Sequence, residues 1–185
     1  MMAFTHALAG AVLAAPVVAF APELAVPAAL AGIVGGLVPD VDLFVGRHRR
    51  TLHFPVLGWA LALPATALAT LAPTAATVAA AVGCVSFAVH AGTDALGAGD
   101  EIRPWERTSP EAVYDHLHGR WIRPRYWIRY DGAPEDAVAT AALAIPVVAF
   151  YPAPLPAVAA ACVGLGVAYA AVRRRLPPVV EELVG

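Results

Sequence analysis

The sequence predicts an all-α fold, a polytopic membrane bundle of about six helices in three hairpins that forms a single integral membrane domain over residues 1–185. Of the 185 residues, 59% are hydrophobic and only 14% are charged, whereas about 25% are charged in a typical soluble domain. The charges are unevenly placed, because three long tracts are almost free of them and prolines divide each tract. An ordinary soluble enzyme is therefore excluded.

The three apolar tracts lie at residues 3–38, 54–99 and 137–172, and their only charged side chains are Glu23 and Asp94. A membrane-spanning helix needs about 20 apolar residues, so each tract has room for two spans joined by a turn. Proline-containing turns at 20–23, 71–74 and 151–156 supply the divisions, because proline disfavours helix at the residue before it.

The six helices are expected at residues 4–20, 24–38, 55–71, 74–97, 136–151 and 156–172. The second and fifth are short enough to be tilted, half-buried or re-entrant. Isolated prolines at 16, 27, 64 and 146 are expected to kink their helices, which membrane bundles tolerate. The segment 100–136 is longer than an ordinary connection, so it is expected to hold a small structured element.

All twelve basic residues are arginines, and they fall in the two long loops and after the last helix. Because positively charged loops stay in the cytoplasm, the N-terminus, the C-terminus and both long loops are predicted to be cytoplasmic in a multi-pass protein of the cell membrane. The stretch 1–6 lacks the basic region of a cleavable signal peptide, so the first apolar run is expected to be a true helix.

The net charge of −2 offers no bulk attraction to nucleic acid, and no direct nucleic-acid partner is expected. Segment 120–130 alternates arginines with aromatic residues, a pattern that suits lipid head groups or simple positive-inside anchoring. Cys84 and Cys162 lie in apolar runs, without the spacing of a disulfide framework or a zinc-cysteine site. The predicted partner is the lipid bilayer.

Histidines and aspartates from four segments gather at the cytoplasmic ends of the predicted helices: His6, Asp40, Asp42, His53, His90 and Asp94. The last two are four residues apart, which places them on one helix face in the spacing of a two-ligand metal clamp. Imidazole and carboxylate ligands together suit Zn²⁺, and also Mn²⁺ or Fe²⁺. The sequence therefore predicts a divalent-metal site at one membrane face.

Each residue also has an ordinary structural explanation. His6 can be an interfacial or capping residue, and Asp40 and Asp42 can end a helix in a turn after proline. His90 and Asp94 can form a hydrogen bond within their helix, although ionisable groups in a span are costly and usually functional. The convergence of all these segments favours the metal site over the separate explanations.

The order His6, Pro-Asp-x-Asp at 39–42, His-Arg-x-x-x-His at 48–53 and His-x-x-x-Asp at 90–94 resembles the LexA-binding, inner-membrane-associated hydrolases, a family of membrane-bound metal-dependent hydrolases. That family is distantly similar to the zinc-dependent phospholipase C and single-strand nuclease superfamily. The resemblance implies metal ligation by His6, by Asp40 or Asp42, and by His53, His90 and Asp94, with Asp94 as the bridging ligand.

Two departures from the family pattern limit what it implies. The family commonly has Gly and Ser in the histidine motif, which are absent from His48 to Phe54. His116 and His118 stand at a spacing unlike that of the later ligands of the superfamily, which favours one or two ions over three. The sequence assigns no role to His48, His116 or His118.

The chemistry expected of such a site is metal-dependent hydrolysis of a phosphoester, either a phospholipid or a soluble compound, at the cytoplasmic interface. A carboxylate that is not a ligand, Asp40 or Asp42, would orient or deprotonate water. Arg49 and Arg50 would receive the negative charge of the phosphate. The alternative is a non-catalytic adaptor or metal sensor that recruits a partner through residues 100–136. A transporter is disfavoured, because transport sites typically lie at the bilayer midplane.

Overall fold

The computed structural model describes residues 1–178, and it confirms a mostly helical chain. The α-helices are α1 (Ala3–Leu13), α2 (Ala15–Phe20), α3 (Pro22–Leu37), α4 (Trp59–Leu71), α5 (Ala75–Thr93), α6 (Pro134–Phe150) and α7 (Leu155–Val172). Short 3-10 helices follow three of them: η1 (Val38–Leu43), η2 (Asp94–Leu96) and η3 (Arg173–Arg175). Helices α1 and α2 meet at Ala14, two residues before Pro16, so they form one interrupted helix.

The helix positions agree with the sequence prediction apart from small shifts at the ends. The helix expected from residue 55 begins at Trp59, because residues 54–58 form a turn in which the Gly58 N–H donates to the Phe54 carbonyl at 2.9 Å. The helix expected to run to 97 ends at Thr93 and tightens into η2. Pro22 and Pro134 occupy first helical positions, where the missing N–H costs nothing.

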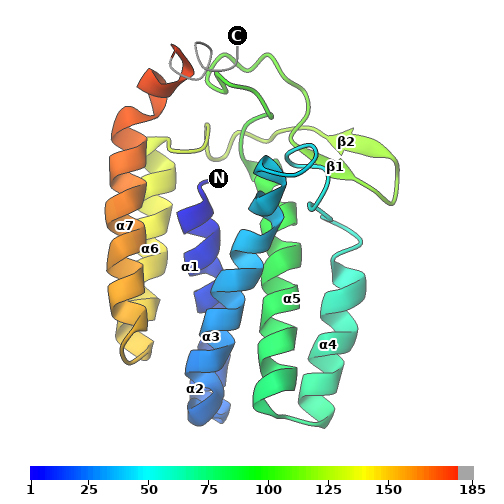
Figure 1. Cartoon of the computed structure of the whole chain (residues 1–185), viewed down its shortest axis with the longest axis vertical. Coiled ribbons are helices and arrows are strands. Elements are labelled where there is room, and N and C mark those ends of the chain that lie inside the picture. The colour runs from blue at the N-terminus through cyan, green and yellow to red at the C-terminus, as the bar shows by residue number, and fades with distance from the viewer. Residues whose placement is uncertain (179–185) are drawn as a thin grey trace.

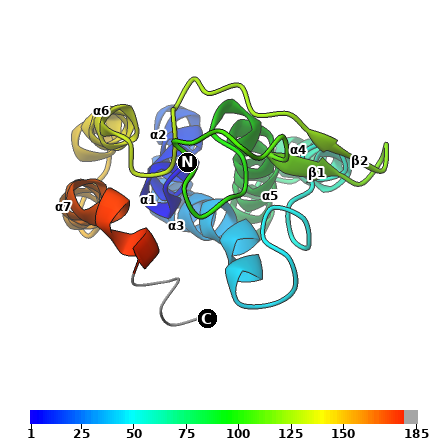
Figure 2. The same cartoon turned by 90° about the horizontal axis from the view of Figure 1, so that it is seen from above.

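The helices run along the long axis of the molecule, and the short turns after α2, α4 and α6 lie at its lower end in Figure 1. The N-terminus and the longer segments lie at the opposite end. Seen from above, α1 lies between α3 on one side and α6 with α7 on the other, while α5 separates α3 from α4 (Figure 2). The segments that carry the arginines are therefore together at one end.

Four helical stretches among the described residues are long and apolar enough to cross a membrane: Ala3–Phe20, Pro22–Leu43, Ala75–Leu96 and Leu155–Pro178. Helix α4 is a shorter apolar helix. Large apolar side chains point outward on these helices and their neighbours, among them Leu61, Leu63, Ile145 and Leu165. Such an apolar exterior is compatible with a lipid environment, in which the outer face of a bundle need not be polar.

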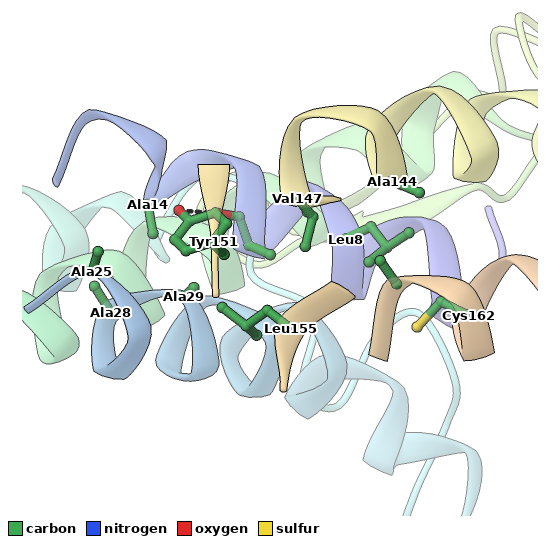
Figure 3. Packing of buried hydrophobic residues seen from close by; sticks show 12 residues of the cluster. Leu8, Ala14, Ala25, Ala28, Ala29, Ala144, Val147, Tyr151, Leu155 and Cys162 are labelled. Carbon is green, nitrogen blue, oxygen red and sulfur yellow. Dashed lines mark hydrogen bonds between the residues drawn. The ribbon is translucent and has the colours of Figure 1, made fainter. Parts of the chain in front are cut away.

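The interior is packed through small residues. A Cβ atom built on Gly10 of α1 would lie 2.0 Å from the Gly32 carbonyl oxygen of α3, and one built on Gly35 would lie 2.1 Å from the Gly83 oxygen of α5. Glycine is required at these contacts because the helix backbones touch. Figure 3 shows the apolar cluster beside them, where the Tyr151 hydroxyl donates to the Ala11 carbonyl at 3.0 Å.

Polar contacts tie the first helix to α6. The carboxylate of Asp136 is fully buried and accepts hydrogen bonds from the Met2 N–H at 2.8 Å and from the Thr5 hydroxyl at 2.6 Å. A carboxylate at a helix N-terminus also interacts favourably with the helix dipole. These bonds fix the position of α1 along the long axis of the bundle. They thereby fix the position of His6, which lies one helical turn after Met2.

The expected element in 100–136 is a short antiparallel hairpin of β1 (Val113–Asp115) and β2 (Arg120–Ile122), with Tyr114 opposite Trp121. The Asp115 carboxylate shapes its turn by accepting from the Leu117 N–H at 3.0 Å and from the His118 ring at 2.6 Å. Burial alone would raise the pKa of Asp115, but these hydrogen bonds lower it below its usual value. The hairpin lies above α4 and α5 in Figure 1.

Candidate metal centre

Side chains from three parts of the chain converge at the end of the bundle that carries the hairpin. Asp40 comes from η1, His53 from the segment before α4, and His90 with Asp94 from the end of α5 and the start of η2. One ligand-type atom from each of these four side chains lies within 4.8 Å of the others. Asp40 is half-buried and the other three are buried.

Hydrogen bonds define which ring nitrogen of each histidine faces the cluster. His90 donates through Nδ1 to the Gly36 carbonyl at 2.6 Å, and His53 donates through Nδ1 to Asp42 at 2.9 Å. Each Nε2 is then left with a lone pair. The two Nε2 atoms lie only 3.2 Å apart, so two lone pairs face the same small volume. Two imidazoles placed in this way can share a cation.

The spacing of the four ligand atoms fits one ion. Tetrahedral ligands at about 2.0–2.1 Å from zinc are about 3.3 Å from one another. His53 Nε2 lies 3.2 Å from Asp94 Oδ2, and His90 Nε2 lies 3.5 Å from the same oxygen. Asp40 Oδ1 is 3.4 Å from His90 Nε2 and 4.0 Å from His53 Nε2. The residues present therefore fit a divalent metal. The distance from Asp40 Oδ1 to His53 Nε2 is the longest of the four.

The two carboxylates of the Pro-Asp-x-Asp motif have different surroundings. Asp42 lies behind His53 and accepts hydrogen bonds from the Nδ1 atoms of His48, at 2.8 Å, and of His53, at 2.9 Å. It also accepts from the Leu52 N–H at 3.2 Å. A carboxylate in this place orients a metal-binding histidine and increases its basicity. Asp40, by contrast, faces the cluster itself.

His48 is a member of this network that the sequence left without a role. One of its ring nitrogens, an oxygen of Asp42 and a ring nitrogen of His53 make a second close group beside the first. The signal was present in the sequence, since His48 shares a short loop with His53. Spacing alone does not show that both rings turn toward one carboxylate.

His6 lies at the edge of the cluster. Its Nε2 is 2.9 Å from Asp94 Oδ1, and its ring stacks on that of His90 with the centroids 3.7 Å apart. The N-terminal ammonium group of Met1 contacts the same Asp94 oxygen at 3.0 Å. Asp94 thus uses one oxygen toward α1 and directs the other toward the two Nε2 atoms.

The two arginines predicted to receive a phosphate lie in different places. Arg49 is buried, with its Nε 3.9 Å from Asp94 Oδ2 and its Nη1 donating to the Ala98 carbonyl at 2.6 Å. Burial would lower the pKa of Arg49, but Asp94 and other nearby carboxylates raise it above its usual value. Arg50 is exposed, and its guanidinium lies over the ring of Tyr114 at 4.5 Å, outside the cluster.

Within residues 1–178, Arg49 Nε is buried and has no hydrogen-bond partner. Such an unsatisfied donor is costly unless a ligand or water completes it. Arg49 also lines a cavity of about 670 Å³ together with Asp40 and His48. The opposite walls come from the start of α1, Leu43 and the end of α7. Asp40, His48 and Arg49 are therefore the site residues that a small molecule in the cavity would meet.

The arginine at the end of α7, Arg173, lines the cavity and is paired with a carboxylate. Arg173 donates to both oxygens of Asp131, at 2.9 Å and 3.1 Å, and the Tyr169 hydroxyl donates to the same carboxylate at 2.5 Å. Burial would raise the pKa of Asp131, but its bonds to Arg173 and Tyr169 lower it. Asp131 and Tyr169 line the cavity as well.

Neither a protein-family model, a curated protein nor a solved structure matches the chain.

Proposed function

We propose that this protein is a membrane-embedded, metal-dependent hydrolase that cleaves a phosphoester. The observation that carries the proposal is the convergence of the His53 and His90 Nε2 atoms, 3.2 Å apart, with oxygens of Asp40 and Asp94. The six helical segments form three hairpins in the cell membrane, with the arginine-bearing end in the cytoplasm. The site then opens at the cytoplasmic interface.

Some residues of the cluster would bind the ion, and others orient the residues that bind it. His53, His90, Asp40 and Asp94 would hold the ion, with His6 supporting Asp94 through its 2.9 Å contact. When bound, a divalent ion such as Zn²⁺, Mn²⁺ or Fe²⁺ supplies Lewis-acid polarisation of a phosphoryl oxygen and a more acidic water. Asp42 keeps His53 in the tautomer that leaves Nε2 free.

Two residues face the substrate. The Nε of Arg49 donates to a phosphate oxygen, which gives a hydrogen-bond acceptor to a buried donor whose nearest carboxylate oxygen, on Asp94, is 3.9 Å away. Asp40 is the carboxylate that reaches both the cluster and the cavity, so it is placed to accept a proton from water there. The cavity of about 670 Å³ is large enough for a phospholipid head group or a small soluble phosphoester.

Elemental analysis of the detergent-purified chain tests the metal part of this proposal. One or two zinc, manganese or iron ions per chain are expected, and they should be lost in the His90→Ala/Asp94→Ala double variant. The His118→Ala variant is the matched control, because His118 contacts Asp115 of the hairpin and not the cluster. A wild-type chain without stoichiometric metal contradicts the proposal.

Hydrolysis is then measured on the metal-loaded protein with bis(p-nitrophenyl) phosphate and with phospholipid in nanodiscs. Turnover of either substrate that disappears with the metal supports the hydrolase. Stoichiometric metal without turnover of any phosphoester favours the second candidate, a non-catalytic adaptor or metal sensor. The observation in favour of that candidate is that the arginines of 120–130 and Trp127 are exposed, Trp127 to 72%.

A further inference from the structure

The segment 47–54 carries His48, Arg49 and His53, yet it belongs to no helix or strand. Inside the segment, the Thr51 N–H donates to the Arg47 carbonyl at 2.9 Å. Such a short irregular loop does not hold two site residues within tenths of an ångström by itself, because its backbone bonds are few. Its position must come from what it packs against.

The β1–β2 hairpin contacts this segment at several successive residues. The Tyr114 N–H of β1 donates to the Arg49 carbonyl at 2.9 Å, and the His116 ring donates through Nε2 to the Arg50 carbonyl at 2.6 Å. At the start of the segment, the Arg47 guanidinium lies 4.5 Å from the ring centre of Trp121. Arg47 is also paired with Glu111, just before β1.

The backbone of Arg49 shows why this support matters. Its φ angle is +58°, in the left-handed region that residues with a side chain rarely adopt. A residue in such a conformation keeps it only when its surroundings hold it there. The hairpin bonds the carbonyl groups of Arg49 and of Arg50, the two peptides that follow the strained φ. The direction of the Arg49 side chain toward Asp94 therefore depends on the hairpin.

The His116 ring also contacts Phe54, the residue next to His53. Its ring stacks on Phe54, with the centroids 4.5 Å apart and the planes 29° from parallel. Phe54 directly follows His53, and Arg50 directly follows Arg49. One half-buried side chain of the hairpin thus contacts the neighbours of both a proposed metal ligand and the proposed phosphate-binding arginine.

We propose that His116 is a positioning residue for the site, and that the β1–β2 hairpin holds Arg49 and His53 in register with the His/Asp cluster. The proposal rests on the proposed function, because it assigns Arg49 the task of binding the phosphate. It gives the hairpin a task in phosphate recognition, although no hairpin side chain is part of the cluster. It separates His116 from His118, whose ring bonds within the hairpin.

The test compares two substitutions of His116 that divide its contacts. His116→Phe keeps an aromatic ring to stack on Phe54 and removes the donor to the Arg50 carbonyl, while His116→Gln keeps an N–H donor. Binding of inorganic phosphate to the metal-loaded protein is measured by calorimetry, together with metal stoichiometry and the thermal midpoint. Leu117→Ala is the control, because Leu117 lies exposed at the hairpin tip.

We expect His116→Phe to weaken phosphate binding about fivefold to tenfold, which corresponds to about one lost hydrogen bond. Metal stoichiometry and thermal midpoint should stay at the wild-type values, and His116→Gln should recover most of the affinity. Unchanged phosphate affinity in His116→Phe overturns the proposal. So does a loss of phosphate binding that only follows loss of metal or of folded protein.

Hydrogen exchange separates this proposal from the proposed function. The amides of residues 49–53 should exchange faster in His116→Phe than in the wild type, with or without metal, and at the wild-type rate in Leu117→Ala. Unchanged exchange in this segment refutes the positioning role even if the protein is a hydrolase. A wild-type chain that binds no metal refutes the hydrolase, while the exchange data still decide whether the hairpin holds the segment.

Discussion

At the scale of single residues, the role of each side chain in the site depends on which of its atoms already form hydrogen bonds. Asp40 and Asp42 stand two apart in one motif, yet one faces the cluster and the other bonds two histidines from behind. Their burial differs accordingly, since Asp42 is 1% exposed while the side chain of Asp40 is 17% exposed and meets the cavity. Asp40 thus suits ligation and proton transfer, whereas Asp42 suits orientation.

This division predicts that Asp42→Asn weakens metal binding without removing a ligand. We expect a 10- to 100-fold loss of metal affinity, because the amide no longer accepts from both His48 and His53 and the basicity of His53 falls. Affinity is measured by competition with a chromophoric chelator. Glu106→Gln, which changes an exposed carboxylate outside the cluster and the hairpin, should keep wild-type affinity. Equal affinities in Asp42→Asn and wild type would show that Asp42 does not orient the ligand.

At the scale of helices, the site depends on how closely α1, α3 and α5 approach. The carbonyl of Gly36 in α3 accepts the Nδ1 proton of His90 from α5 at 2.6 Å, and a Cβ at Gly36 would lie 2.4 Å from the His6 carbonyl of α1. Three helices therefore meet at one glycine. Backbone contact, rather than any long side chain, brings the two histidines into the same cluster.

Gly10→Ala tests this close approach. The new methyl group would collide with the Gly32 backbone, so the helices must separate, at a cost of about 1–3 kcal/mol. At about 2–4 °C per kcal/mol for a chain of this length, we expect the thermal midpoint in detergent to fall by about 2–12 °C. Gly164→Ala in α7 is the control, because no described atom lies within 4 Å of its Cβ position and alanine favours helix. Equal midpoints for the two variants would contradict the packing account.

At the scale of the whole molecule, the bundle has a polar end and an apolar body. The long segments, the hairpin and the arginine-bearing η3 lie at the end that holds the His/Asp cluster, while the short turns lie at the other end (Figure 1). Four described helical stretches are long and apolar enough to span a membrane. The separation of charge along the long axis is the basis of the proposed orientation.

The orientation is tested by labelling single cysteines in a Cys84→Ala/Cys162→Ala background. Ala72→Cys lies in the exposed turn between α4 and α5, and Leu117→Cys lies at the exposed hairpin tip. An impermeant maleimide should label the first in intact cells and the second only after the membrane is permeabilised. The reverse pattern would place the metal centre outside the cytoplasm, and labelling of both in intact cells would contradict a spanning bundle.

The sequence by itself determined the helices and the chemistry that gathers at their ends. Apolar tracts, prolines and arginines are local signals, because hydration and backbone restriction act on each residue wherever it sits. These signals placed the helices to within a few residues. They also placed His6, His53, His90, Asp94 and one of two aspartates together, and the structure brings all of these but His6 into one close group, with His6 against Asp94 at its edge.

The tertiary structure alone decided how those residues are used. It placed Asp40 in the cluster and Asp42 behind His53, brought His48 into the network, buried Arg49 and left Arg50 outside under the hairpin. It also brought residues 113–122 into hydrogen-bond contact with the loop 47–54. None of this follows from spacing along the chain, because ligand geometry is set by tenths of an ångström. The distances between the side chains of the site depend on glycines that let helix backbones touch. They also depend on a hairpin, distant in sequence, that forms hydrogen bonds with a loop containing a strained residue.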